Sequence, residues 1–178
     1  MTDVFRWSGR ARVLALCAML CGGAAHAQFA NRSIGFSAGY IQLNDNILNR
    51  GFPFGLMGTY YLEDGLELTL RVHGLIVTVA VANNVQAFAA SGGFGVRYLF
   101  LQEQFRPYVG AEISYFQLIG GGGGDLLNYV GASPAAGFDV MLGPQFSLGP
   151  RAQVNLYWMI NRNLNTAWEV TVEAAAYF

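Results

Sequence analysis

Apolar and polar residues alternate over long stretches of the chain, most regularly at its C-terminal end. From Trp168 to Phe178 every second residue is apolar, and the residues between them include Glu169 and Glu173. The segment 151–160 repeats the pattern. A β-strand points successive side chains to opposite faces, whereas a helix would mix the two sets. The period therefore predicts strands with one apolar and one polar face.

Weaker copies of the same pattern predict eight strands in all. Short turns are predicted at 63–65, at 101–106 and at Gly149-Pro150, and mostly longer connections lie between them. Transmembrane barrels have short periplasmic turns and longer outer loops. The sequence therefore predicts an all-β fold, an eight-stranded antiparallel up-and-down transmembrane β-barrel. The predicted strands are 33–42, 53–62, 66–76, 87–100, 107–117, 135–146, 151–160 and 167–178.

The segment 75–82 departs from the alternation, because it is apolar on both faces before it meets Asn83-Asn84. We interpret it as part of a hairpin that extends beyond the membrane. A two-residue turn would exchange the faces of the flanking strands. The sequence therefore favours an odd loop length or a bulge, and it leaves the register open between the two.

The composition decides which face points outward. Hydrophobic residues make up 53% of the 178 residues and charged residues only 12%, with no Lys. A soluble domain carries about 25% charged residues. A soluble lipocalin-like barrel also alternates, but its exterior has to be charged. The apolar faces are therefore predicted to contact lipid, and the lack of a basic patch argues against a nucleic-acid partner.

The first residues have the features of a signal peptide. Three Arg residues precede an apolar core at 13–21, which is too short to span a bilayer as a helix, and Ala25-His26-Ala27 follows. We expect cleavage between Ala27 and Gln28, so that residues 1–27 form the signal peptide and 28–178 the barrel domain. An uncleaved membrane anchor is the less favoured alternative. Both cysteines lie inside the signal, so the sequence predicts no disulfide and no Cys metal site in the barrel domain.

Two groups of residues are predicted to have structural roles. Eight strands leave an interior that side chains can fill, and the polar faces would bring opposite charges together there. Aromatic residues near strand ends suit the two membrane interfaces. The predicted lumenal charge network consists of Arg71, Arg97, Glu112, Glu173 and Asp139, extended by Glu67, Arg151 and Glu169. The predicted interfacial aromatic girdle consists of Tyr40, Tyr60, Tyr98, Tyr108, Trp158, Trp168 and Phe178.

Three features suggest a catalytic or ligand-binding site, but none has the pattern that such a site requires. His73 is the only histidine after the signal, and it lacks the His-x-Ser motif of lipid A deacylases, although it could meet Ser91 or Ser114 in space. The run 120–124 consists of Gly, but no Lys follows it as a phosphate loop requires. Asp125, Asn128 and Asp45-Asn46 lack the spacing of a Ca²⁺ site. The sequence therefore predicts no catalytic residue, metal or cofactor.

With these features, the chain resembles the OmpA-like family of small eight-stranded outer-membrane barrels, which includes opacity-type and OmpW-like proteins. The segment from Arg106 to Glu112 is similar to a strand opening common in that family, and the terminal Phe178 resembles the signal read by the barrel-assembly machinery. The resemblance implies a Gram-negative outer-membrane location, with outer-membrane lipid, lipopolysaccharide and that machinery as partners. It implies a structural or surface-interaction role through the loops, whose ligand stays unknown. A lipid A-modifying enzyme and an OmpW-like conduit for small hydrophobic compounds are the alternatives.

Overall fold

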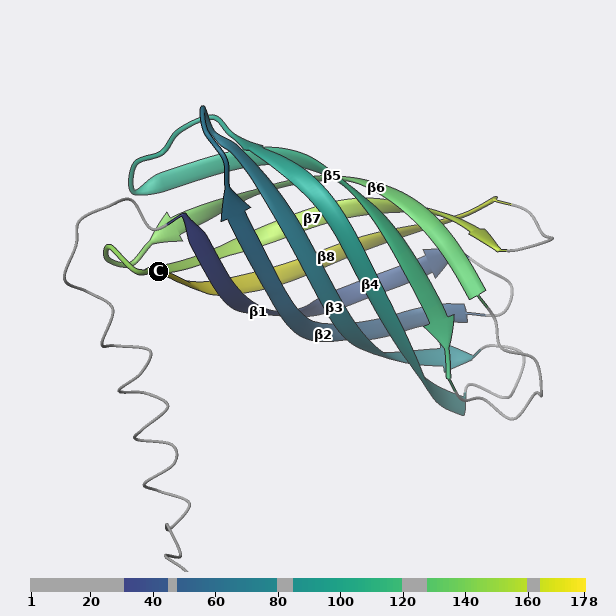
Figure 1. Ribbon diagram of the computed structural model, residues 1–178. Helices are drawn as coiled ribbons and strands as arrows, with labels where there is room; N and C mark the ends of the chain where they lie inside the picture. The colour runs from purple at the N-terminus through teal and green to yellow at the C-terminus, as the bar shows by residue number, and fades with distance from the viewer. Residues whose placement is uncertain (1–30, 45–47, 80–84, 120–127, 160–163) are drawn as a thin grey trace, which may run out of the picture.

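The computed structural model describes residues 31–44, 48–79, 85–119, 128–159 and 164–178. Eight strands follow one another in chain order, and each pairs antiparallel with the next. The last strand pairs with the first and closes the barrel (Figure 1). The all-β, closed antiparallel prediction is confirmed. The strands are β1 (Arg32–Asn44), β2 (Leu48–Tyr61), β3 (Leu66–Val79), β4 (Val85–Leu99), β5 (Phe105–Leu118), β6 (Asn128–Met141), β7 (Phe146–Met159) and β8 (Leu164–Tyr177).

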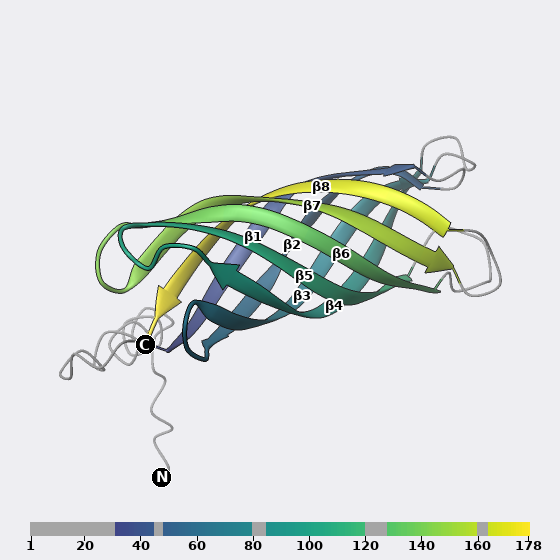
Figure 2. The ribbon, with the colours of Figure 1, turned by 90° about the horizontal axis from the view of Figure 1, so that it is seen from above.

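The short turns lie together at one end of the barrel. The C-terminus and the turns at 62–65, 100–104 and 142–145 lie at one end, which we call the turn end (Figure 2). The opposite end, where the described residues of β1 stop at Asn44 and those of β3 at Val79, is called the loop end. The predicted signal peptide and its cleavage site lie outside the described residues, as do the Gly run 120–124, Asp125 and Asp45-Asn46.

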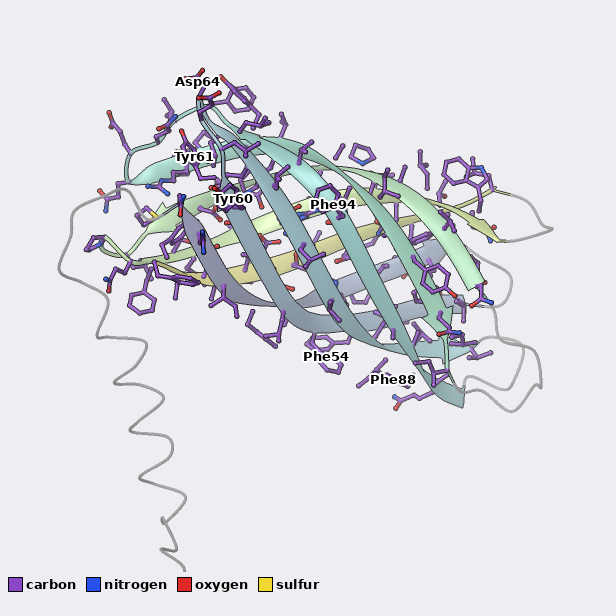
Figure 3. The ribbon with its side chains drawn as sticks, in the orientation of Figure 1. Phe54, Tyr60, Tyr61, Asp64, Phe88 and Phe94 are labelled. Carbon is purple, nitrogen blue, oxygen red and sulfur yellow. The ribbon has the colours of Figure 1, made fainter. Side chains whose placement is uncertain are left out.

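The outer surface of the barrel is apolar along every strand. Leu70 is 58% exposed, Val72 is 61% exposed and Ile113 is 68% exposed. Aromatic side chains such as Phe54, Phe88 and Phe94 are drawn on the same outer surface (Figure 3). Exposing apolar side chains to water is unfavourable, by about 25 cal/mol per Å² of apolar surface, so this surface suits hydrocarbon. Within the described residues, no helix is both long enough and apolar enough to cross a membrane.

The predicted turn at Gly149-Pro150 is wrong. Both residues lie inside β7, and the chain turns instead at 142–145, where Gly143 has a φ of 149°. Pro150 is exposed on the outer wall, and the ladder between β6 and β7 has no pair at Phe138 and Pro150. A proline lacks the N–H that a ladder position needs, which explains this interruption. Strands β6 and β7 consequently begin earlier than the alternation predicted.

The hairpin of β3 and β4 has the odd connection that the sequence favoured. Val79 pairs with Val85, so residues 80–84 separate the two strands and the faces are kept. Leu75, Val77 and Val79 point into the barrel, whereas Ile76 faces outward. This segment is apolar on both faces because the lumen itself is apolar at the loop end.

Candidate functional site: the lumen of the barrel

The middle of the lumen is filled by charged side chains from six of the strands. Each belongs to the inward-facing row of its strand, and each is at most 7% exposed. A buried charge is costly unless an opposite charge or hydrogen bonds accompany it. We call this set the charge cluster: Glu67 and Arg71 on β3, Arg97 on β4, Glu112 on β5, Asp139 on β6, Arg151 on β7 and Glu173 on β8.

Glu112 and Glu173 each contact both Arg71 and Arg151. Arg71 Nη2 lies 2.5 Å from Glu173 Oε1, and Arg71 Nε lies 3.2 Å from Glu112 Oε2. Arg151 lies 3.1 Å from the same Glu112 oxygen and 4.0 Å from Glu173 Oε1. Each of these two carboxylates is thus shared by two guanidinium groups, and the four side chains bridge β3, β5, β7 and β8 across the lumen.

Arg97 forms the half of the cluster nearer the turn end. Its Nε donates to Glu67 Oε2, and its Nη1 lies 3.2 Å from Asp139 Oδ2 and 3.9 Å from Glu173 Oε2. The guanidinium carbon also lies 4.8 Å from the ring centre of Tyr108. Glu173 therefore contacts all three arginines, and Arg97 is held by two further acids and an aromatic face.

Tyr108 requires a correction, because it does not belong to the aromatic girdle. It is 2% exposed, and its hydroxyl donates to Glu173 Oε2 over 3.4 Å. Tyr108 has the same parity along β5 as the lumenal Glu112, so the two must share the inner face. The outward position near the start of β5 belongs to Phe105, which is 47% exposed.

The other predicted girdle residues point outward at the two ends of the barrel. Tyr60 and Tyr98 lie near the turn end, Tyr40 and Trp168 near the loop end, and the rings of the latter pair are 5.4 Å apart. Each of these six side chains is at least 39% exposed: Tyr40 39%, Tyr60 40%, Trp158 46%, Trp168 46%, Tyr98 47% and Phe178 61%.

A layer of amides separates the charge cluster from the loop end. Arg151 donates to Gln153 Oε1 over 2.6 Å, and Gln153 Nε2 donates onward to Glu169 Oε2 over 3.1 Å. Asn155 Nδ2 also donates to that Glu169 oxygen, over 3.3 Å, and Asn155 Oδ1 accepts from Ser133 over 2.5 Å. Among the described residues, Glu169 lies within ion-pair distance of no guanidinium, so it is held by amides alone.

Acids outnumber arginines in the described lumen. Five carboxyl side chains face three guanidinium groups, since Glu169 adds a fifth acid to the four of the cluster. The four acids of the cluster share the three arginines, and Glu169 is left for neutral donors. The alternation of the sequence predicted which charges face the lumen, but it did not predict that amides at alternate positions of β7 hold Glu169.

His73 has a partner that the sequence did not suggest. Its Nε2 lies 2.9 Å from Ser37 Oγ. The sequence had suggested Ser91 or Ser114 as the partner instead. Strand β2 lies between β1 and β3, and Gly55 stands at the position opposite His73. Because Gly55 has no side chain, the two groups can meet across it. Ser37 is fully buried and His73 is 8% exposed, so this pair is shielded from solvent.

The loop end of the lumen is apolar. A cluster of buried side chains there includes Leu48, Val77 and Phe116, with Tyr129 and Tyr157 packed against the Phe116 ring. Ring centres in this group lie 5.3 and 6.0 Å from that of Phe116. The hollow among these rings is about 10 Å³, which is roughly the least that holds a single water. The protein's own side chains thus fill this part of the lumen.

Glycine at position 137 makes room for Tyr108, which leads to a prediction. A Cβ at this position would lie 2.6 Å from Tyr108 Oη and 2.6 Å from the carbonyl oxygen of Pro150. Gly137→Ala should therefore push Tyr108 away from Glu173 and Arg97. We expect a loss of about 1–3 kcal/mol in the free energy of unfolding, as in other overpacked interiors. Urea titration in detergent micelles measures it.

Gly58→Ala serves as the matched control for that variant. The nearest atom to a Cβ at Gly58 is Ser33 O at 3.7 Å, which is an ordinary contact. Gly58→Ala should leave the urea midpoint unchanged or raise it slightly, because Gly weakens a strand. Equal losses in the two variants would contradict the packing of Tyr108 against Gly137.

The described residues contain no group of three or more His, Asp or Glu side chains arranged to hold a metal ion. The cluster instead offers fixed ion pairs and hydrogen bonds. Every carboxylate within it lies within 3.2 Å of a guanidinium nitrogen. Its arrangement suits a structural plug that ties the strands together and closes the lumen.

Comparison with known proteins gives structural matches alone. No family model matches the chain, and no curated protein sequence matches it. Neisserial surface protein A matches with a TM-score of 0.67 and 15% identity, over 83% of this chain and 97% of that one. The N-terminal β-barrel domain of Pseudomonas aeruginosa OprF matches with a TM-score of 0.56 and 18% identity, over 85% and 100%. The P. aeruginosa outer membrane protein OprG matches with a TM-score of 0.58 and 14% identity, over 85% and 97%.

These matches cover the whole barrel at low identity, so they concern the fold. The resemblance to small outer-membrane barrels that the sequence predicted is confirmed at that level. Strand number, chain order and closure agree with the description built above from pattern and register. The chain has the fold of the small eight-stranded β-barrels of Gram-negative outer membranes.

Proposed function

We propose that this chain is a non-enzymatic outer-membrane barrel that acts through its outer surface and its extracellular connections. The observation that carries the proposal is the charge cluster, which occupies the middle of the lumen with side chains that are at most 7% exposed. A closed interior leaves the exterior and the loop end as the surfaces on which a partner can act. The loop end is then the extracellular side, since short turns face the periplasm in such barrels.

The proposal includes export of the chain and its insertion into the outer membrane. The expected signal peptide at 1–27 would deliver the chain across the inner membrane, and the barrel-assembly machinery would insert it. The apolar outer wall fits lipid, and closure leaves no unpaired strand edge in the membrane. The fold shared with Neisserial surface protein A and the OprF domain is consistent with this location.

The first test combines location with conductance. Membrane fractionation followed by a heat-modifiability gel is expected to find the folded chain in the outer membrane. The purified chain in planar bilayers should conduct no steady ion current, because a network of buried ion pairs seals the lumen. Arg97→Ala should introduce measurable leak, since it removes the side chain that joins Glu67 to Asp139. A wild-type current as large as that of the variant would count against the sealed lumen.

A second candidate, a path for small hydrophobic compounds, is favoured by one observation. The lumen is apolar at the loop end, where Leu48 and Val77 are fully buried. Such a path would have to leave the lumen through the barrel wall, on the loop-end side of the amide layer. The charge cluster blocks the lumen on the turn-end side of that layer. Uptake of an apolar fluorescent probe by proteoliposomes distinguishes the two. Uptake that stops on Val77→Arg would favour the path, and no uptake by the wild type favours the sealed barrel.

Catalysis is not part of the proposal. A hydrolytic site needs a Ser activated by a His, with the His oriented by an acid. Ser37 and His73 meet at hydrogen-bond distance, but both are buried inside the barrel wall. Deletion of the chain should leave lipid A unchanged, as measured by mass spectrometry. A change in its acylation pattern that the wild type restores and Ser37→Ala does not would contradict this expectation.

A further inference from the structure

The outer surface changes from apolar to polar at the loop end. On β4 the outward row runs through Phe94 and Phe88, which lie on the outer wall (Figure 3), and it stops at Gln86. The outward rows of six other strands also reach a polar residue there, and each of these residues is at least partly exposed. We call the set the outer collar: Gln42, Arg50, Thr78, Gln86, Gln117, Asn128 and Thr166.

The inner surface changes in the opposite sense at the same level. Thr78 lies between the buried Val77 and Val79, and Gln117 precedes the buried Leu118. Toward the turn end the order is reversed, since the outward rows are apolar there and the charge cluster lies inside. A barrel in hydrocarbon has an apolar exterior, whereas a barrel in water has an apolar interior. The strands therefore pass from one medium to the other near the collar. We call the part of the barrel from the collar to the loop end the loop-end section.

The loop-end section has a core of its own. This core is the apolar cluster described above, which includes Leu48, Val77 and Phe116. The amides of Gln153 and Asn155 separate it from the charge cluster. Its stability therefore depends on the burial of apolar side chains and not on the ion pairs. Parts of a protein with separate cores can open at different free energies.

Two prolines interrupt the strand ladders just below the loop-end section. The described ladder between β1 and β2 has no pair at Phe52 or Pro53, and the described ladder between β6 and β7 has none at Ser133 or Pro134. Both ladders resume toward the loop end. A proline lacks the N–H that a ladder position needs. The backbone coupling between the two parts of the barrel is therefore reduced on two of the eight seams.

We propose that the loop-end section stands in water outside the bilayer as a separate folding unit, which can open while the charge cluster keeps the barrel closed within the membrane. Pro53 and Pro134 mark the level at which it opens. Opening uncovers the apolar cluster to molecules on that side of the membrane. The apolar lumen at the loop end then needs no hydrophobic passenger, because an interior surrounded by water has to be apolar. This arrangement depends on the membrane location and not on the role proposed above.

Labelling with a water-soluble maleimide tests where the medium changes. Gln86→Cys and Phe94→Cys lie on the same outward row of β4, and each is made in a chain whose Cys17 and Cys21 are replaced by Ser. The chains are folded into vesicles with reagent on both sides. Gln86→Cys should be labelled and Phe94→Cys should be protected by lipid. Equal labelling at the two positions would overturn the proposal.

Urea titration in vesicles tests whether the loop-end section opens separately. Trp158 and Trp168 both lie at the loop end, so tryptophan emission reports on this section once Trp7→Phe removes the remaining tryptophan. The electrophoretic shift of the folded barrel reports on the whole molecule. In the wild type, the emission should change at a lower urea concentration than the electrophoretic shift, since separate units give transitions that do not coincide.

Two variants of β2 decide which unit each probe follows. Leu48 is fully buried in the loop-end section, and Leu48→Ala should raise the opening constant of that section by at least about tenfold and leave the electrophoretic midpoint in place. Met57→Ala is the matched control, since Met57 is 3% exposed in the separate apolar cluster near the turn end. It should lower the electrophoretic midpoint. Val77→Ala is a milder second variant if Leu48→Ala does not fold. Coincident transitions in the wild type and in these variants would overturn the proposal.

Discussion

Glu173→Gln should lower the free energy of unfolding by about 3–5 kcal/mol, the usual cost of removing one partner from a buried ion pair. Glu173 contacts Arg71 at 2.5 Å and lies within 4.0 Å of Arg97 and Arg151, so its neutralisation leaves all three guanidinium groups short of charge. Urea unfolding in detergent micelles, followed by the electrophoretic shift of the folded barrel, measures the loss.

Glu169→Gln is the matched control for this prediction. Glu169 lies on the same face of β8, four residues earlier, and it is also buried, with 5% exposed against 1% for Glu173. Its partners are the amides of Gln153 and Asn155, which a glutamine can also meet. We expect a change within about 1 kcal/mol, the size of one neutral hydrogen bond. If both variants lose the same stability, the pairing of Glu173 with the arginines does not hold the lumen together.

The second large effect is expected on the outer wall. Ile113→Arg should destabilise the folded barrel by about 2–4 kcal/mol in lipid, because it puts a guanidinium against hydrocarbon near the middle of β5. Ile113 is the most exposed large apolar side chain of the described chain, at 68%. In a water-facing surface the same change would cost almost nothing, since exposed substitutions usually lie within about 0.5 kcal/mol.

Gln117→Arg controls for the introduced charge. Gln117 lies on the same outward row of β5, four residues toward the loop end, in the outer collar. An arginine there reaches the headgroup region and should cost about 0–1 kcal/mol. Refolding into vesicles with urea titration compares the two. Similar small effects at both positions would mean that the wall of β5 faces water.

The alternation of the sequence was sufficient to predict the fold, because a strand keeps its faces apart over its whole length. In β8 the row from Trp168 to Phe178 and the row of Glu169 and Glu173 never exchange sides. The turn predicted at Gly149-Pro150 was wrong because Gly-Pro is common in turns. The outward position of Pro150 in β7 depends instead on the ladder with β6. That ladder cannot be seen from a single strand.

Individual contacts in the lumen depended on information that parity does not carry. Tyr108 was predicted to belong to the girdle because an aromatic residue near a strand start suits the membrane interface, although it shares the parity of the lumenal Glu112. The pairing of His73 with Ser37 requires that Gly55 on the intervening strand leaves a gap. The sequence did not predict the apolar loop end of the lumen, because the inner and outer positions are both apolar over residues 75–79.

The most direct test of the central claim is a scan of lipid exposure along β8. Single-cysteine variants at 170, 171, 172 and 175, in a chain whose Cys17 and Cys21 are replaced by Ser, are spin-labelled in a bilayer, and collision with oxygen, which concentrates in hydrocarbon, is measured. The account predicts high collision rates at Val170 and Val172, whose side chains face outward, and low rates at Thr171 and Ala175, whose side chains face the lumen. The reverse pattern, or equal rates at all four positions, would contradict an apolar face in lipid around a polar interior.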